Sequence, residues 1–201
     1  MVAKSTGTSG GPGRPRSQEA WEAVMKAVDA LLETQGYRRL TMEAIAKEAG
    51  VGKPTLYRWW PNAPSIVIEA LLRKADDGIG LPDTGSLRND LISYVTETCR
   101  ILAGPTGEIV ARLMAETQFD AEFADTFRQK FIYVRREALA SLLRRGAERG
   151  EIPTNADLEW LADLCYGPIW YRLLNRHAEL DDAFASRIVD LLLLGARTPA
   201  D

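Results

Sequence analysis

Residues 41–60, TMEAIAKEAGVGKPTLYRWW, decide the fold of this chain because they carry the pattern of two short helices joined by a tight turn. Apolar or small residues recur at helical spacing and give both helices one inward face. The predicted inward positions are Ile45, Ala46, Ala49, Val51, Leu56 and Trp60. Gly50 stands between the helices, where a sharp turn with positive φ is needed. The stretch therefore predicts a helix-turn-helix.

The second helix of this motif points donor-rich and aromatic side chains outward: Lys53, Thr55, Tyr57, Arg58 and Trp59. Such a helix fits the major groove of DNA, with its first residues at base edges and its Tyr, Trp and Arg at phosphates. Lys53 and Thr55 are the predicted base contacts, because both donate hydrogen bonds to bases. Pro54 lies beside them in the first turn, where its missing N–H costs little. A buried pair of helices is the alternative, but it would not leave these groups on one exposed face.

Residues 40–62, LTMEAIAKEAGVGKPTLYRWWPN, resemble the TetR/AcrR family of transcriptional regulators, as does the preceding helix with Trp21, Val24, Val28 and Leu31. The resemblance covers roughly the first third of the chain. It implies that Thr41 and Tyr57 contact the DNA backbone. It also implies that Trp59 takes the place of a phosphate-binding ring and that Trp60 is a core aromatic.

One position departs from the family pattern. The family usually has a Lys near the start of the next helix, which donates to a phosphate, followed by an acidic residue. Here Asn62 is followed by Ala63 and Pro64. The lysine contact is therefore not carried over, and the backbone N–H groups at the start of this helix are left for DNA.

Composition predicts a globular chain with one small and one larger domain, since 46% of its 201 residues are hydrophobic. The net charge of −3 alone argues against binding to nucleic acid. Residues 1–60, however, hold nine Lys and Arg against six Asp and Glu, so the positive charge lies at the end with the helix-turn-helix. Cys99 and Cys165 lie in separate apolar patterns, which favours buried thiols and a cytoplasmic protein. No signal peptide and no apolar run of membrane-spanning length are visible, so no membrane partner is expected.

Residues 1–16 form a tail rich in Gly, Ser and Pro that contains cations and no acid. Its GRPR run at residues 13–16 carries Arg14 and Arg16, which short basic arms of this kind place in the minor groove. A solvated leader is an equally good interpretation of the composition.

Helical patterns continue to the end of the chain, and none of its segments alternates as a strand would. The sequence predicts an all-α protein with an N-terminal three-helix helix-turn-helix domain, a C-terminal helical bundle and about nine helices in total. The expected divisions are a flexible basic arm at residues 1–16, a DNA-binding domain at 17–64 and a ligand-binding and dimerisation domain at 65–201.

Phenylalanines at 119, 123, 127 and 131 recur every four residues, which is most often a core pattern. The functional interpretation is an apolar cavity for a small hydrophobic effector, since bundles commonly hold such pockets. Its predicted lining is Tyr94, Met114, Phe123, Phe127, Tyr166 and Trp170. Pro168 inside the predicted helix supports this interpretation, because an internal proline kinks a helix and opens space.

The last two predicted helices carry more apolar surface than a peripheral pair needs, which favours a two-fold interface. Its predicted residues are Leu173, Leu174, Ile188, Leu191 and Leu192. The family resemblance implies the same pairing of C-terminal helices. A homodimer also suits DNA recognition, because two symmetric recognition helices read an inverted-repeat operator with far greater discrimination than one.

Catalysis finds no support in the sequence. His177 is the only histidine, and no glycine-rich phosphate loop or nucleophile elbow is present, so no enzyme activity, metal or cofactor is expected. The sequence thus favours a sequence-specific DNA-binding repressor that a small hydrophobic ligand releases from its operator. A constitutive DNA-binding regulator without an effector and a helical protein-interaction module are the alternatives.

Overall fold

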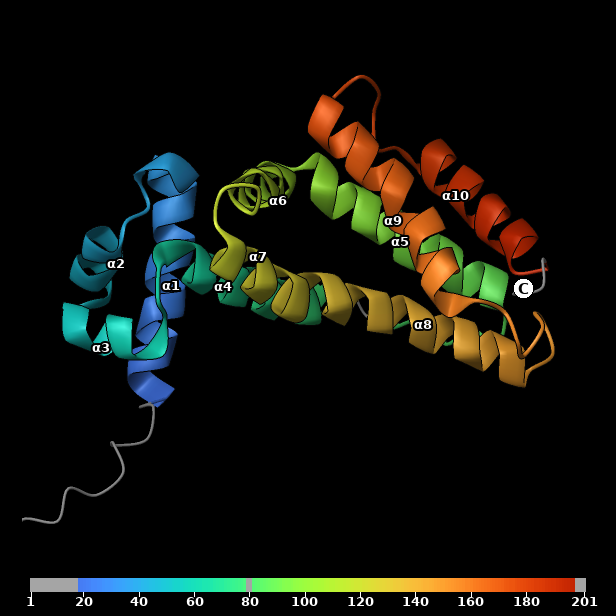
Figure 1. Ribbon diagram of the computed structural model, residues 1–201, viewed down its shortest axis with the longest axis horizontal. Helices are drawn as coiled ribbons and strands as arrows, with labels where there is room; N and C mark the ends of the chain where they lie inside the picture. The colour runs from blue at the N-terminus through green and yellow to red at the C-terminus, as the bar shows by residue number, and fades with distance from the viewer. Residues whose placement is uncertain (1–17, 79–80, 198–201) are drawn as a thin grey trace, which may run out of the picture. The chain divides into compact units, whose positions relative to one another are not determined.

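The computed structural model describes residues 18–78 and 81–197, and within them the protein is helical with no strand (Figure 1). The helices are α1 (Gln18–Gln35), α2 (Met42–Ala49), α3 (Lys53–Trp59), α4 (Ala63–Gly78), α5 (Leu87–Ala103), α6 (Pro105–Glu116), α7 (Ala121–Phe127), α8 (Tyr133–Glu148), α9 (Leu158–Asn175) and α10 (Asp182–Gly195). A 3-10 turn (Tyr37–Arg39) follows α1, and a π-helical turn (Arg128–Ile132) joins α7 to α8. α7 and α8 are therefore one continuous helix. Counted in this way, the described residues confirm the prediction of an all-α protein with about nine helices.

The chain divides into two compact units between Pro61 and Asn62. The first unit contains α1 to α3, and the second contains α4 to α10. The division expected from the sequence, after residue 64, falls inside the first turn of α4. The basic arm predicted at residues 1–16, with Arg14 and Arg16, lies outside the described residues.

In the first unit, α1 packs on α2 and α2 packs on α3. The buried face of α1 consists of Val24, Met25, Ala27, Val28 and Leu31, whose spacing puts them on one side of the helix. Met42, Ile45 and Ala46 supply the facing side of α2. Leu56 and Trp60, exposed by 0% and 1%, hold α3 against this small core.

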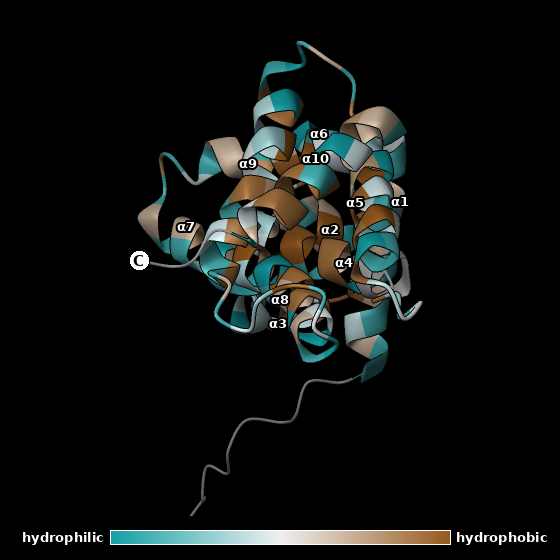
Figure 2. Cartoon of the chain, turned by 90° about the vertical axis from the view of Figure 1, so that its right-hand side faces the viewer, coloured by the Kyte–Doolittle hydropathy of each residue, from teal (hydrophilic) through white to brown (hydrophobic). Residues whose placement is uncertain are grey.

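In the second unit, α5 contacts α6, α8, α9 and α10. Its buried face repeats at helical spacing through Leu87, Leu91, Tyr94, Val95, Cys99 and Leu102. Figure 2 shows the apolar, brown residues of this unit gathered between its helices. The two cysteines are free and buried, as predicted, and burial raises the pKa of the Cys99 thiol to about 11. No helix among the described residues is both long and apolar enough to cross a membrane.

The π-helical turn changes the phenylalanine pattern expected from the sequence. Phe123, Phe127 and Phe131 are buried, and the last two rings stack with centroids 5.1 Å apart. A repeat of four residues exceeds the roughly 3.6 residues of an α-helical turn, so it drifts around an α-helix, whereas the wider π turn keeps it on one face. Beyond the turn, Val134 is 42% exposed, so the buried stripe does not continue to it. Phe119 is 91% exposed and precedes α7, so its assignment to the stripe was wrong.

A buried carboxylate ties the loop before α5 to the end of α8. Asp90 is fully buried, and its Oδ1 accepts hydrogen bonds from the backbone N–H of Thr84 at 2.7 Å and from its hydroxyl at 2.8 Å. The guanidinium of Arg149 lies 3.4 Å from Oδ2. Burial by itself would raise the pKa of Asp90, but the hydrogen bonds from Thr84 and the charge of Arg149 outweigh it and lower the pKa.

We expect Asp90→Asn to lower the free energy of unfolding by ~1–3 kcal/mol at pH 7, because a buried charged hydrogen-bonding group is removed. A lowered folded pKa stabilises the protein at pH values above the ordinary aspartate pKa of about 3.9, and this contribution is lost as pH falls through the lowered value. Urea unfolding at several pH values should therefore show the two proteins converging in acid. The exposed control Asp182→Asn should change stability by less than about 0.5 kcal/mol. Equal effects of both variants at pH 7 would contradict this role of Asp90.

Candidate nucleic-acid interface

The turn between α2 and α3 has the geometry that the sequence predicts. Thr41 caps α2, since its hydroxyl oxygen accepts a hydrogen bond from the N–H of Ala44 at 3.1 Å. Gly50 ends α2 in the left-handed conformation, with φ 64° and ψ 27°. Gly52 then precedes α3 in an extended conformation. Two short helices thus meet at a turn that needs glycine at its centre.

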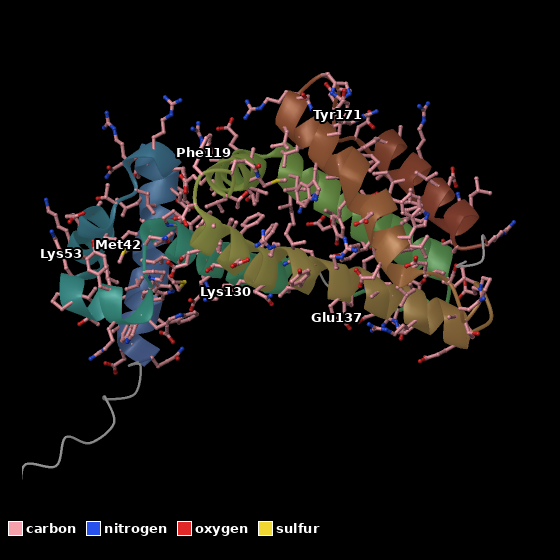
Figure 3. All side chains as sticks on the ribbon, in the orientation of Figure 1. Met42, Lys53, Phe119, Lys130, Glu137 and Tyr171 are labelled. Carbon is pink, nitrogen blue, oxygen red and sulfur yellow. The ribbon has the colours of Figure 1, made fainter. Side chains whose placement is uncertain are left out.

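The outer face of α3 carries the side chains predicted to contact DNA. Lys53, Pro54 and Arg58 are exposed, and Tyr57 is 53% exposed. Figure 3 shows Lys53 on the outer side of the unit. Thr55 and Trp59 are half-buried, because they flank the inward face formed by Leu56 and Trp60. The predicted division of this helix into two faces is therefore present.

An aromatic and cationic group at the end of α3 is fixed by ring contacts. The rings of Trp59 and Trp60 meet edge to face with centroids 5.5 Å apart. The guanidinium carbon of Arg58 lies 5.7 Å from the centre of the Trp59 ring, within the range of a cation–π contact. The buried Trp60 thereby anchors Trp59, and Trp59 in turn restricts the guanidinium. Such an ordered cation is suited to a phosphate oxygen.

Lys53, one of the two predicted base-contacting residues, forms an ion pair that the sequence analysis missed. Its Nζ donates to Oε1 of Glu43 on α2 at 2.7 Å, and both side chains are more than half exposed. This hydrogen bond lowers the pKa of the Glu43 carboxyl group. The sequence signal was an acid at the second position of α2, ten residues before Lys53, which helical periodicity alone does not connect to it.

The start of α4 differs from the expectation that its backbone N–H groups are left for DNA. Asn62 precedes α4, and its Oδ1 accepts from the N–H of Ser65 at 2.9 Å and from the Ser65 hydroxyl at 2.7 Å. Pro64 has no N–H. The N–H of Ser65 is bonded to Asn62 and Pro64 has none, so Ala63 is the only one of the first three residues of α4 whose N–H is left by these two effects. The missing family lysine is therefore not replaced by a row of backbone donors.

The six residues predicted to line an effector cavity occupy a packed region of the second unit. Tyr94 and Tyr166 are buried and share a hydrogen bond of 2.8 Å between their hydroxyl groups. The rings of Phe123, Phe127, Phe131, Trp170 and Tyr166 follow one another at centroid distances of 5.1–6.5 Å. Met114 is half-buried on α6. Tyr166 and Trp170 also line a pocket of about 330 Å³.

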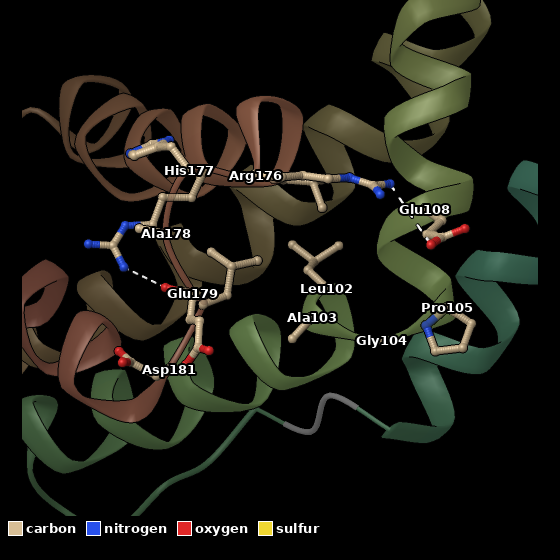
Figure 4. Close-up of a pocket in the computed structure, with 13 residues that line it drawn as sticks. Leu102, Ala103, Gly104, Pro105, Glu108, Arg176, His177, Ala178, Glu179 and Asp181 are labelled. Carbon is tan, nitrogen blue, oxygen red and sulfur yellow. Dashed lines mark hydrogen bonds and ion pairs between the residues drawn. The ribbon is translucent and has the colours of Figure 1, made fainter.

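A larger pocket of about 920 Å³ lies where α5 ends, α6 begins and α9 passes into the loop before α10 (Figure 4). It is lined by Leu102, Ala103, Gly104, Pro105, Glu108, Arg172, Leu173, Arg176, His177, Ala178, Glu179, Leu180 and Asp181. Arg172 is held over the ring of Phe184, 3.7 Å from its centre. Nη2 of Arg176 lies 4.0 Å from Oε1 of Glu108. The backbone of Arg176 is in the left-handed conformation, with φ 52°. Sequence reasoning missed this pocket because its residues come from segments about seventy positions apart; the only local signal was the Gly104-Pro105 break.

The residues predicted for a dimer interface fall into two groups. Leu174 and Leu191 are 48% and 40% exposed. Leu173, Ile188 and Leu192 are exposed by 7%, 2% and 0%, because α10 packs on α5 and α9 within the same chain. These three side chains belong to the core of the single chain. Trp160, Tyr171 and Leu194, which the sequence analysis did not assign to the interface, are 54%, 63% and 66% exposed.

Comparison with known proteins agrees with the geometry of the first unit. Residues 24–70 match the family model for bacterial regulatory proteins of the tetR family, and residues 81–192 match the tetracyclin repressor-like C-terminal domain. The chain belongs to the TetR family of DNA-binding transcriptional regulators. This confirms the resemblance noted at residues 40–62 and extends it over most of the chain.

Several relatives illustrate the extent of the similarity. The HTH-type transcriptional regulator YdeS of Bacillus subtilis is 35% identical over 177 residues, which cover 88% of this chain and 89% of that protein. The DNA-binding transcriptional repressor TetR of Mycobacteroides abscessus is 28% identical, over 89% of this chain and 94% of that protein. The crystal structure of the TetR family regulator SCO0332 superposes with a TM-score of 0.81 at 35% identity, covering 89% of this chain and 98% of the other.

Proposed function

We propose that this TetR-family chain is a homodimeric repressor that binds an inverted-repeat operator in double-stranded DNA and is released by a small organic molecule. The observation that carries the DNA-binding part is the exposed outer face of α3, held in place by Leu56 and Trp60. Similarity to a DNA-binding repressor supports the assignment of repression. The proposed role is regulatory rather than enzymatic, because the relatives are transcriptional regulators, and its place is the cytoplasm, where bacterial DNA lies.

The proposed contacts follow the chemistry of each side chain. Lys53 and Thr55, with Pro54 between them, meet base edges in the major groove. Tyr57, Arg58 and Trp59 meet phosphates with their polar hydrogen atoms. Thr41 donates its hydroxyl proton to a phosphate while its oxygen accepts from Ala44, since a hydroxyl group can do both. Arg14 and Arg16 are proposed minor-groove contacts on the grounds of sequence alone.

Two substitutions on α3 separate base reading from phosphate binding. We expect Lys53→Ala to relax the preference at one base pair of each half-site by ~1–3 kcal/mol, because a base contact is lost. Tyr57→Phe should weaken binding to all sequences alike, because phosphates carry no sequence information. Sites selected from random duplexes would be compared with a random duplex by gel shift. Lys47→Ala, which removes an exposed charge from α2, is the control. Equal losses on selected and random DNA for both α3 variants would refute the assignment.

An exposed apolar stripe on α9 supports the proposed dimer. Trp160, Leu164, Gly167, Tyr171 and Leu174 follow one another at steps of four and three residues, so they share one side of the helix. Leu164 is half-buried and the other four are exposed. On α10, Leu191 and Leu194 are also exposed. An uncovered apolar surface of this kind is typical of an interface between proteins. We therefore propose a two-fold interface in which α9 and α10 of each chain pack on the same helices of the other.

The dimer is tested by mass. Light scattering at micromolar concentration should give twice the chain mass of 22.3 kDa. Leu174→Arg combined with Leu194→Arg should give single chains, because two charges would be buried in the interface without partners. Phe119→Ser, at a side chain that is 91% exposed but lies on neither helix, is the control and should stay dimeric. A wild-type mass of one chain would refute the dimer, and a dimeric double variant would place the interface elsewhere.

The proposed effector site is the larger pocket of the second unit. Its apolar lining includes Leu102, Leu173 and Leu180. Its charged lining includes Arg176 and Glu108, which a dashed line joins in Figure 4. This lining suits a molecule with an apolar body and one polar end. In the region of the aromatic residues predicted from the sequence, the rings pack against one another and occupy most of the space. Two of these residues, Tyr166 and Trp170, line the smaller pocket. A coupling of ~1–3 kcal/mol between effector and operator would suffice for release.

Filling the pocket tests this location. We expect some compounds from a library of amphipathic molecules to raise the melting temperature of the wild type and to release it from its operator. At a ligand concentration of a hundred times Kd, the free energy of unfolding should rise by about 2.7 kcal/mol. Ala103→Trp should abolish both effects, because the indole would occupy the pocket that Ala103 lines. Ala103→Ser is the matched control and should keep them. Unchanged stabilisation of Ala103→Trp by the same compounds would exclude this pocket.

A further inference from the structure

The ion pair between Glu43 and Lys53 joins the two helices of the helix-turn-helix on its exposed surface. Glu43 is the second residue of α2, and Lys53 is the first residue of α3. Their side chains are 58% and 53% exposed and meet at 2.7 Å between Nζ and Oε1. The contact therefore lies in water, at the end of α3 that we propose to meet base edges.

Stability gives little reason for this contact. Exposed ion pairs typically contribute ~0–1 kcal/mol. A carboxylate is also an unfavourable group beside DNA, which carries about one negative charge per 1.7 Å of its axis. Glu43 holds the amine of Lys53 and offsets its charge, so the pair weakens general attraction to phosphates. Both effects oppose tight non-specific binding.

The chemistry of the pair matches the edge of a G·C base pair in the major groove. Guanine offers the acceptors O6 and N7, and cytosine offers a donor at its N4 amino group. A lysine amine has three N–H donors, so Lys53 keeps two after its bond to Glu43. The carboxylate of Glu43 has further lone pairs free to accept. The pair thus presents a donor and an acceptor side by side, with Nζ and Oε1 2.7 Å apart.

We propose that Glu43 and Lys53 act as one recognition unit for a single G·C pair, with Lys53 donating to guanine and Glu43 accepting from the N4 amino group of cytosine. This rests on the proposed binding of DNA through α3 and adds Glu43 as a specificity-determining residue. When adenine replaces guanine and thymine replaces cytosine, the carboxylate of Glu43 faces the acceptor O4 of thymine and Lys53 faces the donor N6 of adenine. A random phosphate meets a paired rather than a free lysine.

The test uses the full-length protein and sites selected from random duplexes. For the wild type, replacing the G·C pair of one half-site with A·T, with adenine in the place of guanine, should weaken binding by roughly 5- to 150-fold. In Glu43→Ala that ratio should fall by at least about fivefold, while binding to a random duplex becomes tighter because a negative charge has been removed. Glu48→Ala removes an exposed carboxylate from the same helix, five residues further along, and should leave the ratio unchanged.

A double-mutant cycle completes the test. If the two residues read one base pair together, Glu43→Ala with Lys53→Ala should lose about as much discrimination at that position as either single variant, rather than the product of both. Overturning results would be equal changes in Glu43→Ala and Glu48→Ala on all sequences, or independent effects at two different base pairs. Circular dichroism melting would show that the variants stay folded. A wild type that selects no sequence at all would refute the proposed function itself, whereas a selective wild type with an unaffected Glu43→Ala would refute only the paired unit.

Discussion

The recognition helix depends on the burial of Leu56 and Trp60. α3 has only seven residues, and isolated helices shorter than about 12–15 residues are marginal in water. Its sequence contains a proline and begins after a glycine, so intrinsic propensity adds little. Two fully buried side chains and the left-handed turn at Gly50 therefore supply what the backbone of α3 cannot. Because those side chains fix one face of so short a helix, the orientation of every group on the other face follows from them.

Because α3 is short, its exposed side chains are ordered by neighbouring residues rather than by a long helix. Trp60 is part of the core, yet its ring also supports Trp59, and Trp59 supports the guanidinium of Arg58. At the other end of α3, Glu43 orders the amine of Lys53. Long side chains lose rotamer entropy when they bind, roughly 0.5–1.5 kcal/mol each. Ordering them beforehand through neighbouring helices reduces that loss, so a surface with few contacts can still discriminate.

The sequence predicted what depends on local pattern. The turn at Gly50 and the two faces of α3 follow from side-chain types at fixed spacing, and the structure confirms them. Features that depend on distant packing were missed. Ile188 and Leu192 were expected at an interface, but no local signal reveals that α10 covers α5 of its own chain. The Glu43–Lys53 contact and the larger pocket likewise join residues that periodicity treats separately.

The π-helical turn between α7 and α8 has a consequence for how this chain is compared with its relatives. The turn holds one residue more than an α-helix of the same rise, so the buried positions before and after it follow different periodic frames. In a relative whose helix is α-helical throughout, an alignment could pair core residues with both Phe127 and Leu139 only if it opened a one-residue gap inside the helix. Gaps are normally expected in loops. Residue numbering across this helix therefore identifies equivalent core positions only in relatives that share the turn.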